Sequence, residues 1–227
     1  MRIAIAQINP VLGDFEYNAK KILDFSKQAL AKKCDLVIFP ECAIFGYHPF
    51  DMLERRKLVE QQNKWCEYIY KNLPKGISII FGLITNNKAA KGKPYYNSAV
   101  FYTQGGKTRY FHKQLLPTGD VFDEARFIEA GDLNKNFFSF KGKKFYLTIC
   151  EDIWGWPDIK GRSPYKVNPL AKVSKKAVDL VINLSASPFH LGKMKKREHM
   201  TAKTAKHFKA PMVYVNLVGA QDEIIYD

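Results

Sequence analysis

The feature of the sequence that most constrains its fold is the alternation of short apolar runs with longer segments of helical spacing. The short runs are rich in β-branched and aromatic residues, which favour strands. Such alternation is typical of α/β proteins, in which helices pack against the faces of a sheet. The predicted strands are residues 3–8, 36–39, 77–83, 96–102, 108–111, 145–149, 180–184 and 213–215.

Three segments are predicted to be helices. In residues 19–30 the apolar side chains recur at helical intervals and the lysines lie off that face, so this helix should cover a sheet. The second helix is expected within residues 51–73, where Pro74 and Gly76 end the pattern. The third is expected within residues 193–208.

One pair of predicted strands should form an antiparallel hairpin, because the Gln-Gly-Gly segment at 104–106 between 96–102 and 108–111 is a turn signal. Strands separated by helices favour parallel pairing, so the added hairpin predicts mixed sheets. No internal repeat and no linker rich in Pro, Gly and Ser interrupts the sequence. We therefore interpret residues 1–227 as one domain.

Composition narrows the class of protein. Hydrophobic residues make up 46% of the chain and charged residues 26%, which indicates a globular protein and excludes a disordered one. No run reaches the ~18 consecutive apolar residues of a membrane span. The N-terminal residues also become polar too soon for a secretion signal, so we expect a cytoplasmic protein without membrane attachment.

Cysteine usage gives no sign of a metal site or a disulfide framework. The four cysteines, at positions 34, 42, 66 and 150, include no CxxC pair. No cysteine and histidine spacing is typical of zinc ligands either. We therefore expect no bound metal.

The net charge raises one alternative class of function. The formal net charge is +14, which favours attraction to polyanions, so a nucleic-acid-binding domain is one alternative. The basic segment near the third predicted helix lacks the interleaved aromatic residues that stack on bases, so we do not expect a nucleic-acid partner. Its basic residues are Lys193, Lys195, Lys196, Arg197, Lys203, Lys206 and Lys209.

Three reactive side chains each follow a predicted strand within two residues, namely Glu41, Lys113 and Cys150. In open α/β sheets, ligands collect outside the carboxyl ends of the strands, because the loops there vary while the strands keep their positions. Singly, each residue is a weak signal, since strand-end charges are usually solvated and a strand-end cysteine is usually part of the core. Together they have complementary chemical roles, and we predict that they form a catalytic site.

The proposed roles follow from what thiol chemistry requires. A thiol with a pKa of about 8.5 is mostly protonated at neutral pH, so Cys150 needs a base. Glu41 can accept its proton and later return it to a departing amine. Lys113 is expected to favour the thiolate, to keep Glu41 ionised and, with the backbone N–H of Glu151, to stabilise the oxyanion on an attacked carbonyl. The pattern predicts hydrolysis of an amide through a thioester.

No histidine is placed to compete with this set, so a papain-like pair of cysteine and histidine is the less economical alternative. The ring of His112 should point away from Lys113, because successive side chains of a strand face opposite sides. The histidines expected to be structural or solvated are His48, His112, His190, His199 and His207.

Three short segments resemble the motifs of a known family. The Phe-Pro-Glu of residues 39–41, the Tyr-Phe-His-Lys of 110–113 and the Ile-Cys-Glu-Asp of 149–152 are similar to the glutamate, lysine and cysteine motifs of the nitrilase, or carbon-nitrogen hydrolase, superfamily. More narrowly, the chain resembles the N-terminal glutaminase domains of glutamine-dependent NAD synthetases. The supporting segments are 6–14, 116–127, 183–193 and 215–223, so the resemblance covers almost the whole chain.

The resemblance implies a four-layer α-β-β-α sandwich with mixed sheets that hydrolyses glutamine to glutamate and ammonia. It also implies that the ammonia passes to a C-terminal synthetase domain. That domain would use ATP and Mg to amidate nicotinic acid adenine dinucleotide to NAD, while the glutaminase step needs no cofactor. A homo-oligomer is a further expectation from the resemblance.

The resemblance also implies which residues bind glutamine. Glu124 is expected at the α-ammonium of the substrate and Lys193 at its α-carboxylate. Trp154 is expected to form a wall of the pocket, and Ser187 to contribute a further contact. Glu151, whose backbone N–H is expected at the oxyanion, is the remaining residue of the predicted substrate site.

Two points limit what the resemblance implies. The chain stops at Asp227, while the domain of the family continues, so we expect a domain that is incomplete at its C-terminus and lacks the synthetase domain. The enzymatic alternative is a free-standing nitrilase-type amidase that acts on ω-amides or carbamoyl compounds. Recognition of the α-amino and α-carboxylate groups, by Glu124 and Lys193, separates the two functions.

Overall fold

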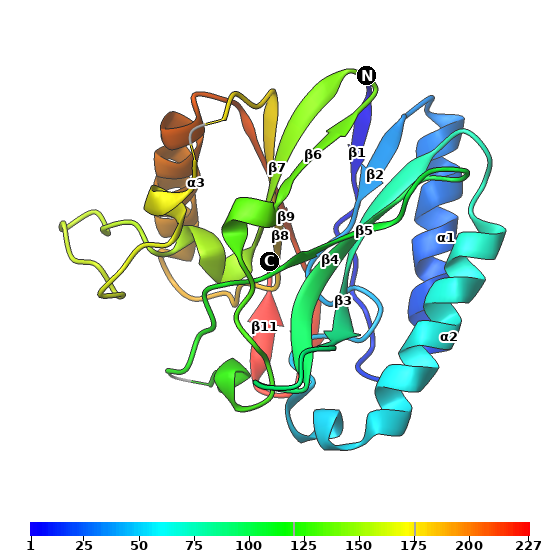
Figure 1. The fold of residues 1–227 in the computed structure, drawn as a ribbon, viewed down its shortest axis with the longest axis horizontal. Coiled ribbons are helices and arrows are strands. Elements are labelled where there is room, and N and C mark those ends of the chain that lie inside the picture. The colour runs from blue at the N-terminus through cyan, green and yellow to red at the C-terminus, as the bar shows by residue number, and fades with distance from the viewer. Residues whose placement is uncertain (120, 175) are drawn as a thin grey trace.

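The computed structural model describes residues 1–119, 121–174 and 176–227. The α-helices of these described ranges are α1 Phe15–Ala31, α2 Arg56–Asn72 and α3 Lys193–Phe208. Two β-sheets lie face to face, with α1 and α2 on the outer side of one and α3 on the outer side of the other (Figure 1). The expected four-layer α-β-β-α sandwich is therefore confirmed.

The first sheet comprises β1 Ile3–Ile5, β2 Leu36–Ile38, β3 Ser78–Asn86, β4 Tyr95–Tyr102 and β5 Arg109–His112, in that spatial order. β1, β2 and β3 are parallel to one another, and α1 and α2 form the crossovers between them. β4 is antiparallel to both of its neighbours, β3 and β5. The predicted hairpin is therefore present as β4 and β5. The sheet is mixed, as the sequence predicts.

The second sheet comprises β6 Phe137–Phe140, β7 Lys143–Ile149, β8 Leu180–Ser185 and β9 Met212–Asn216. β7, β8 and β9 are parallel, and β6 is antiparallel to β7. β6 is not among the predicted strands. A two-residue turn, Lys141 and Gly142, connects β6 to its partner β7. The φ values of these residues, 46° and 73°, are those of a type I′ hairpin turn. The sequence signal is weak because a lysine stands where such turns usually have Asn or Asp.

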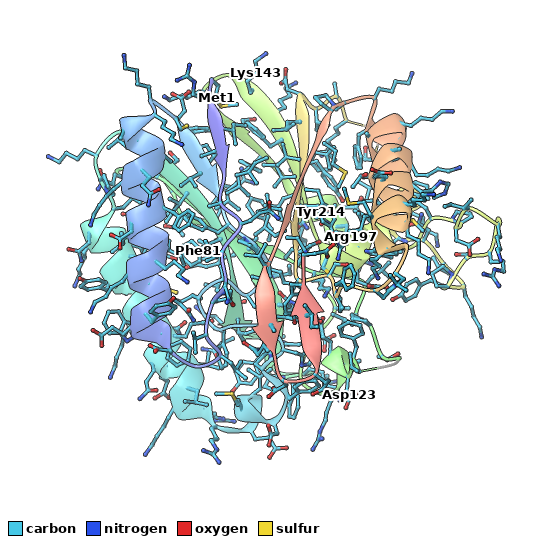
Figure 2. The ribbon with its side chains drawn as sticks, turned by 180° about the vertical axis from the view of Figure 1, so that it is seen from behind. Met1, Phe81, Asp123, Lys143, Arg197 and Tyr214 are labelled. Atoms are coloured by element: carbon cyan, nitrogen blue, oxygen red, sulfur yellow. The ribbon has the colours of Figure 1, made fainter. Side chains whose placement is uncertain are left out.

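A short hairpin of β10 Gly219–Gln221 and β11 Ile224–Tyr226 forms a third sheet that the sequence does not predict. It lies at one end of the two larger sheets (Figure 2). The side chains of Gln221 and Tyr226 both donate hydrogen bonds to the carbonyl of Tyr47. The hairpin therefore holds the loop that follows β2, even though about 175 residues of chain separate these partners.

α1 forms where the sequence predicts it. The carboxylate of Asp14 accepts a hydrogen bond from the backbone N–H of Tyr17 at 3.0 Å and so caps the first turn. Its apolar face, which includes Ala19 and Ile22, is buried against the first sheet. Within the described ranges, no helix is long and apolar enough to cross a lipid bilayer.

The inner faces of the two sheets form a shared apolar core, which fixes the distance between the strand ends. Removing this apolar area from water stabilises the pairing of the sheets by about 25 cal/mol per Å². The core residues from the first sheet are Leu36, Ile38, Ile80, Ala99, Phe101 and Phe111. Those from the second sheet are Phe138, Phe145, Leu147, Ile149, Ile182, Leu184 and Val215.

β3 passes so close to the loop after β2 that only glycine fits at residue 82. A Cβ atom on Gly82 would lie 2.2 Å from the backbone nitrogen of Cys42 and 2.6 Å from the Cα of Glu41. Since backbone atoms must then move, we predict that Gly82→Ala lowers the free energy of unfolding by about 1–3 kcal/mol. Urea unfolding at constant pH measures this change. Gly119→Ala is the control, because a Cβ there meets nothing within 4 Å; equal losses in both variants would contradict the close approach.

Candidate active site

Three side chains from different strands meet at one end of the facing sheets. Glu41 lies in the loop after β2, Lys113 directly after β5 and Cys150 directly after β7. Their residues are 0%, 0% and 6% exposed. β7 belongs to the second sheet, so the packing of the two sheets brings the thiol into electrostatic interaction with Glu41 and Lys113. The structure thus brings together the three residues that the sequence predicts as catalytic.

Lys113 is the cation of a buried group with two carboxylates. Its Nζ donates hydrogen bonds to Oε1 of Glu41 at 2.8 Å and to Oε1 of Glu124 at 2.7 Å. The hydroxyl of Tyr47 also donates to Oε1 of Glu124, at 2.8 Å. Glu124, which is expected at the α-ammonium of a substrate, is instead hydrogen-bonded to Lys113 and Tyr47. It is only 2% exposed.

Glu41 is held through both of its carboxylate oxygens. Oε2 accepts a hydrogen bond from the backbone N–H of Ala186 at 2.9 Å, and Oε1 accepts one from Nδ2 of Asn97 at 2.7 Å. Asn97 lies on β4 with its side chain buried. The sequence interpretation does not include Asn97, although a polar residue within an otherwise apolar strand is the signal that could have found it.

Burial sets the protonation of the reacting groups. It raises the pKa of the Cys150 thiol well above its usual value, and the carboxylate of Glu41 raises it further, against a smaller opposing effect of Lys113. Lys113 favours the thiolate, as expected, but burial outweighs its ammonium, so the resting group is a thiol. Catalysis by this thiol requires transfer of its proton to a base.

The pKa values of Glu41 and Lys113 both rise. Burial raises the pKa of Glu41, and the ammonium of Lys113 lowers it by a smaller amount. The pKa of Glu41 therefore stays above its usual value. For Lys113, burial alone would lower the pKa, but the carboxylates of Glu124 and Glu41 raise it well above the usual value. Lys113 is thus a permanent cation at neutral pH, and Glu41 has the raised pKa that suits a general base.

The backbone at Cys150 takes an uncommon conformation. Its φ of 42° lies in the left-handed region, where a residue with a side chain is strained, at the junction of β7 with the short 3-10 helix Cys150–Ile153.

Asp152 joins the cysteine loop to the segment after Lys113. Its carboxylate accepts hydrogen bonds from the backbone N–H groups of Ile149 at 2.8 Å, Gln114 at 2.9 Å and Leu115 at 3.0 Å. Burial raises its pKa to about 7, although these three donors oppose the rise. Asp152 belongs to the cysteine motif, yet its structural role depends on a contact with the lysine loop that the sequence cannot show.

Two of the predicted substrate-binding residues contact each other near Cys150. Nζ of Lys193 lies 4.1 Å from the centre of the Trp154 ring, a cation–π contact. Burial lowers the pKa of Lys193, while Cys150 and Glu151 oppose this change through their charge. Glu151 accepts a hydrogen bond from the hydroxyl of Tyr165 at 2.6 Å, and burial raises the pKa of its carboxyl group. The structure therefore gathers Glu151, Trp154 and Lys193 beside the cysteine.

Ser187 is held by α3 and β9. Nη2 of Arg197 donates to the carbonyl of Ser187 at 2.7 Å, and Oδ1 of Asn216 accepts from the backbone N–H of Ser187 at 2.8 Å. The backbone of Ser187 follows Ala186, whose N–H holds Glu41. Figure 2 shows Arg197 near Tyr214 of β9, on the side of the second sheet.

His112 faces the other side of β5. Its Nδ1 lies 2.7 Å from Oγ of Ser98, and its ring stacks on Tyr96 with centres 4.2 Å apart. It borders a cavity of about 660 Å³ beside α2, which neither Lys113 nor Cys150 lines. The prediction that His112 points away from Lys113 is confirmed.

Within the part of the chain that the structure describes, no group of three or more His, Cys, Asp and Glu side chains could hold a metal ion. What the arrangement offers instead is a buried thiol, a fixed carboxylate that can accept its proton and an ammonium that can stabilise developing negative charge.

Comparison with known proteins identifies the family. A sequence model of carbon-nitrogen hydrolases matches residues 2–226. The chain belongs to the carbon-nitrogen hydrolase family. The glutamate, lysine and cysteine motifs that carried the resemblance in the sequence all lie within the matched residues.

Relatives of this carbon-nitrogen hydrolase include longer proteins. The glutamine-dependent NAD(+) synthetase of Synechocystis sp. is 41% identical over 99% of this chain and 41% of its own length. That of Thermotoga maritima is 33% identical over 100% of this chain and 37% of its own length. The chain thus spans about two fifths of the length of these relatives.

Solved structures show the same fold. A glutamine-dependent NAD+ synthetase from Acinetobacter baumannii, in complex with ADP, has a TM-score of 0.82 and 34% identity and is matched over 99% of this chain and 40% of that chain. An amidase of the nitrilase superfamily from Nesterenkonia AN1 has a TM-score of 0.77 and covers 100% of this chain and 80% of its own, but at 17% identity it shows the fold alone.

Removing the buried ammonium of this carbon-nitrogen hydrolase should strongly destabilise it. Lys113→Met leaves Glu41 and Glu124 facing each other without a cation, so we predict a loss of about 3–5 kcal/mol in the free energy of unfolding at neutral pH. Without Lys113 the pKa of Glu41 in the folded state rises further above its unfolded value. A carboxyl group whose pKa is raised by folding stabilises the variant while it is protonated, and this stabilisation is lost as the pH rises through the folded-state pKa. The free energy of unfolding that Lys113→Met loses relative to the wild type should therefore be smaller at pH 5 than at pH 8.

Urea unfolding of Lys113→Met and the wild type at the two pH values tests this prediction. Lys143→Met is the control, because its ion pair with Asp179 is exposed and screened by solvent, so its loss should change the free energy of unfolding little. A loss for Lys113→Met that grows on acidification would show that the two carboxylates are not the cause.

Proposed function

We propose that the chain hydrolyses the side-chain amide of glutamine through a thioester on Cys150, releasing glutamate and ammonia. The observation that carries the proposal is the buried group of Glu41, Lys113 and Cys150 in a chain whose longer relatives are named as glutamine-dependent NAD(+) synthetases. A thiol with a fixed base and a fixed cation is suited to acyl transfer from an amide.

In the first half-reaction, Glu41 accepts the proton of the Cys150 thiol as the sulfur attacks the amide carbon. The ammonium of Lys113 and the backbone N–H of Glu151 stabilise the negative charge on the former carbonyl oxygen. When the C–N bond breaks, Glu41 donates its proton to the nitrogen, which leaves as ammonia, and the thioester remains.

In the second half-reaction, Glu41 accepts a proton from a water molecule that attacks the thioester. The C–S bond breaks, the thiol is restored by the proton on Glu41, and glutamate leaves. Two fixed hydrogen bonds, from Asn97 and Ala186, keep the Glu41 carboxylate in one orientation for both proton transfers.

For recognition of the amino acid, we assign the α-carboxylate of glutamine to Lys193 and a wall of the pocket to Trp154. The cation–π contact between them orients Lys193 beside the cysteine. Glu124 has its hydrogen bonds with Lys113 and Tyr47, which supports a role in holding Lys113 over a role at the α-ammonium. Ser187 and Glu151 complete the substrate side of the site.

We further propose that the ammonia serves an ATP- and Mg-dependent synthetase in the remainder of a longer, homo-oligomeric cytoplasmic protein, where nicotinic acid adenine dinucleotide is amidated to NAD. The support is that the relatives named as NAD(+) synthetases match this chain over about two fifths of their length. The glutaminase step itself uses protein groups alone. A simple ω-amide amidase is the alternative that the experiments below separate.

Loss of the nucleophile or the base should abolish or strongly reduce turnover. Cys150→Ala should show no glutamine hydrolysis, and Glu41→Gln should lower kcat by about 10²–10⁴-fold, because the amide cannot accept the thiol proton. Release of ammonia measures turnover, and circular dichroism verifies the fold. Cys66→Ala on α2 is the control that should keep its kcat; turnover by Cys150→Ala would remove the thiol from the mechanism.

Replacing Lys193 should separate glutamine from simpler amides. Lys193→Met should raise KM for glutamine by about tenfold or more, since a charged hydrogen bond to the α-carboxylate is lost. Hydrolysis of butyramide, which has no α-carboxylate, should not change. Lys195→Met, which alters an exposed lysine of α3, is the matched control. A butyramide rate that exceeds the glutamine rate in the wild type, with no effect of Lys193→Met, would favour the amidase.

A further inference from the structure

A small cavity borders Glu124, next to the loop that follows β2. Its polar wall consists of Tyr47, His48, Asn97 and Glu124. It offers about 10 Å³ for the centre of a water molecule, which is room for one. The apolar remainder of the wall includes Leu53, Ile84, Phe127 and Ile128.

Two polar atoms in this wall are buried without a hydrogen-bond partner among the described residues. They are Oε2 of Glu124 and Nε2 of His48. Nearly all buried polar atoms in native structures are hydrogen-bonded, so two exceptions on residues that line one cavity point to a common partner. The two side chains also interact electrostatically.

The hydrogen bond at the other ring nitrogen decides which atom of His48 carries the proton. The backbone N–H of Phe50 donates to Nδ1 of His48 at 3.2 Å, so Nδ1 is the acceptor. Burial lowers the pKa of His48 to about 4, against an opposing effect of Glu124, and the ring is neutral at neutral pH. The single proton of the neutral ring is then on Nε2. The cavity thus has a donor on His48 and an acceptor on Glu124.

We propose that this cavity binds one water molecule, which accepts a hydrogen bond from Nε2–H of His48 and donates one to Oε2 of Glu124. Tyr47 and Asn97 line the same cavity. Buried waters in proteins typically make two to four such hydrogen bonds. His48, which the sequence analysis assigns a structural or solvated role, becomes a positioning residue for Glu124.

The consequence for the site follows from the contacts of Glu124. Its Oε1 already accepts from Lys113 at 2.7 Å and from Tyr47 at 2.8 Å. The water completes the hydrogen bonding of Oε2 and fixes the plane of the carboxylate, which in turn fixes the ammonium of Lys113 against Glu41. If the chain hydrolyses glutamine as proposed above, His48 therefore affects kcat more than KM.

Substitution by Gln and Asn separates the two nitrogens of His48. The amide nitrogen of Gln can reach the position of Nε2 and keep the donor toward the water, but Gln loses the acceptor for Phe50. The oxygen of Asn stays near the position of Nδ1 and keeps that acceptor, but Asn has no group that reaches the cavity. A water-positioning role therefore requires the Gln variant to retain function and the Asn variant to lose it.

We expect His48→Gln to keep kcat within about threefold of the wild type, and His48→Asn and His48→Phe to lose about tenfold or more, with KM for glutamine little changed in all three. His199→Phe on α3 controls for replacement of a histidine outside the site. Retained kcat in His48→Asn with loss in His48→Gln would assign His48 to capping Phe50 and overturn the proposal. Unchanged kcat in His48→Phe would overturn it as well.

Two measurements on the wild-type protein test for the bound water and do not depend on glutamine turnover. Nitrogen-15 NMR of labelled histidine should show His48 as the Nε2–H tautomer, and a crystal structure that resolves ordered water should place one within hydrogen-bond distance of both orphaned atoms. An Nδ1–H tautomer, a dry cavity or a direct contact of Nε2 with Oε2 would overturn the proposal. A bound water in a protein without glutaminase activity would instead refute the proposed function alone.

Discussion

The buried ammonium of Lys113 between the carboxylates of Glu41 and Glu124 is the interaction on which the site depends. Taking these charges out of water costs several kcal/mol for each ion. Their mutual hydrogen bonds, together with those from Asn97, Ala186 and Tyr47, offset this cost. Three segments of the chain must therefore arrive in register: the loop after β2, the end of β5 and the turn that carries Glu124. The same constraint explains why β3 has a glycine where it passes behind Glu41.

The chemistry follows from burial. Because burial raises the pKa of both Cys150 and Glu41, the resting site holds a thiol beside a base whose proton affinity is increased. In the proposed mechanism, proton transfer to Glu41 therefore accompanies the attack of Cys150 on the amide. Lys113 cannot lose its proton at neutral pH, so it acts through charge alone. Glu124, Tyr47 and the proposed water on His48 hold that charge in place.

Much of the fold was predictable because its signals are local. The apolar runs predict the central strands, the helical spacing predicts α1, and the Gln-Gly-Gly turn predicts the hairpin of β4 and β5. β6 escaped prediction because its turn has a lysine in place of the usual Asn or Asp. The β10–β11 hairpin escaped because it is short and its partner, Tyr47, lies far away in the sequence. Asn97 and Asp152 escaped for a related reason. Each is an ordinary polar residue until a distant segment supplies its partner.

The sequence by itself determined which reactive groups stand at the strand ends, and hence the class of chemistry, because strand position and residue type are properties of short segments. Only the tertiary structure decided which groups are paired and which are protonated. Glu41 accepts a hydrogen bond from Ala186, which lies 145 residues away, and Glu124 binds Lys113 and not open solvent. Pairing and pKa depend on the distance and burial that packing of the two sheets creates, and no local pattern encodes them.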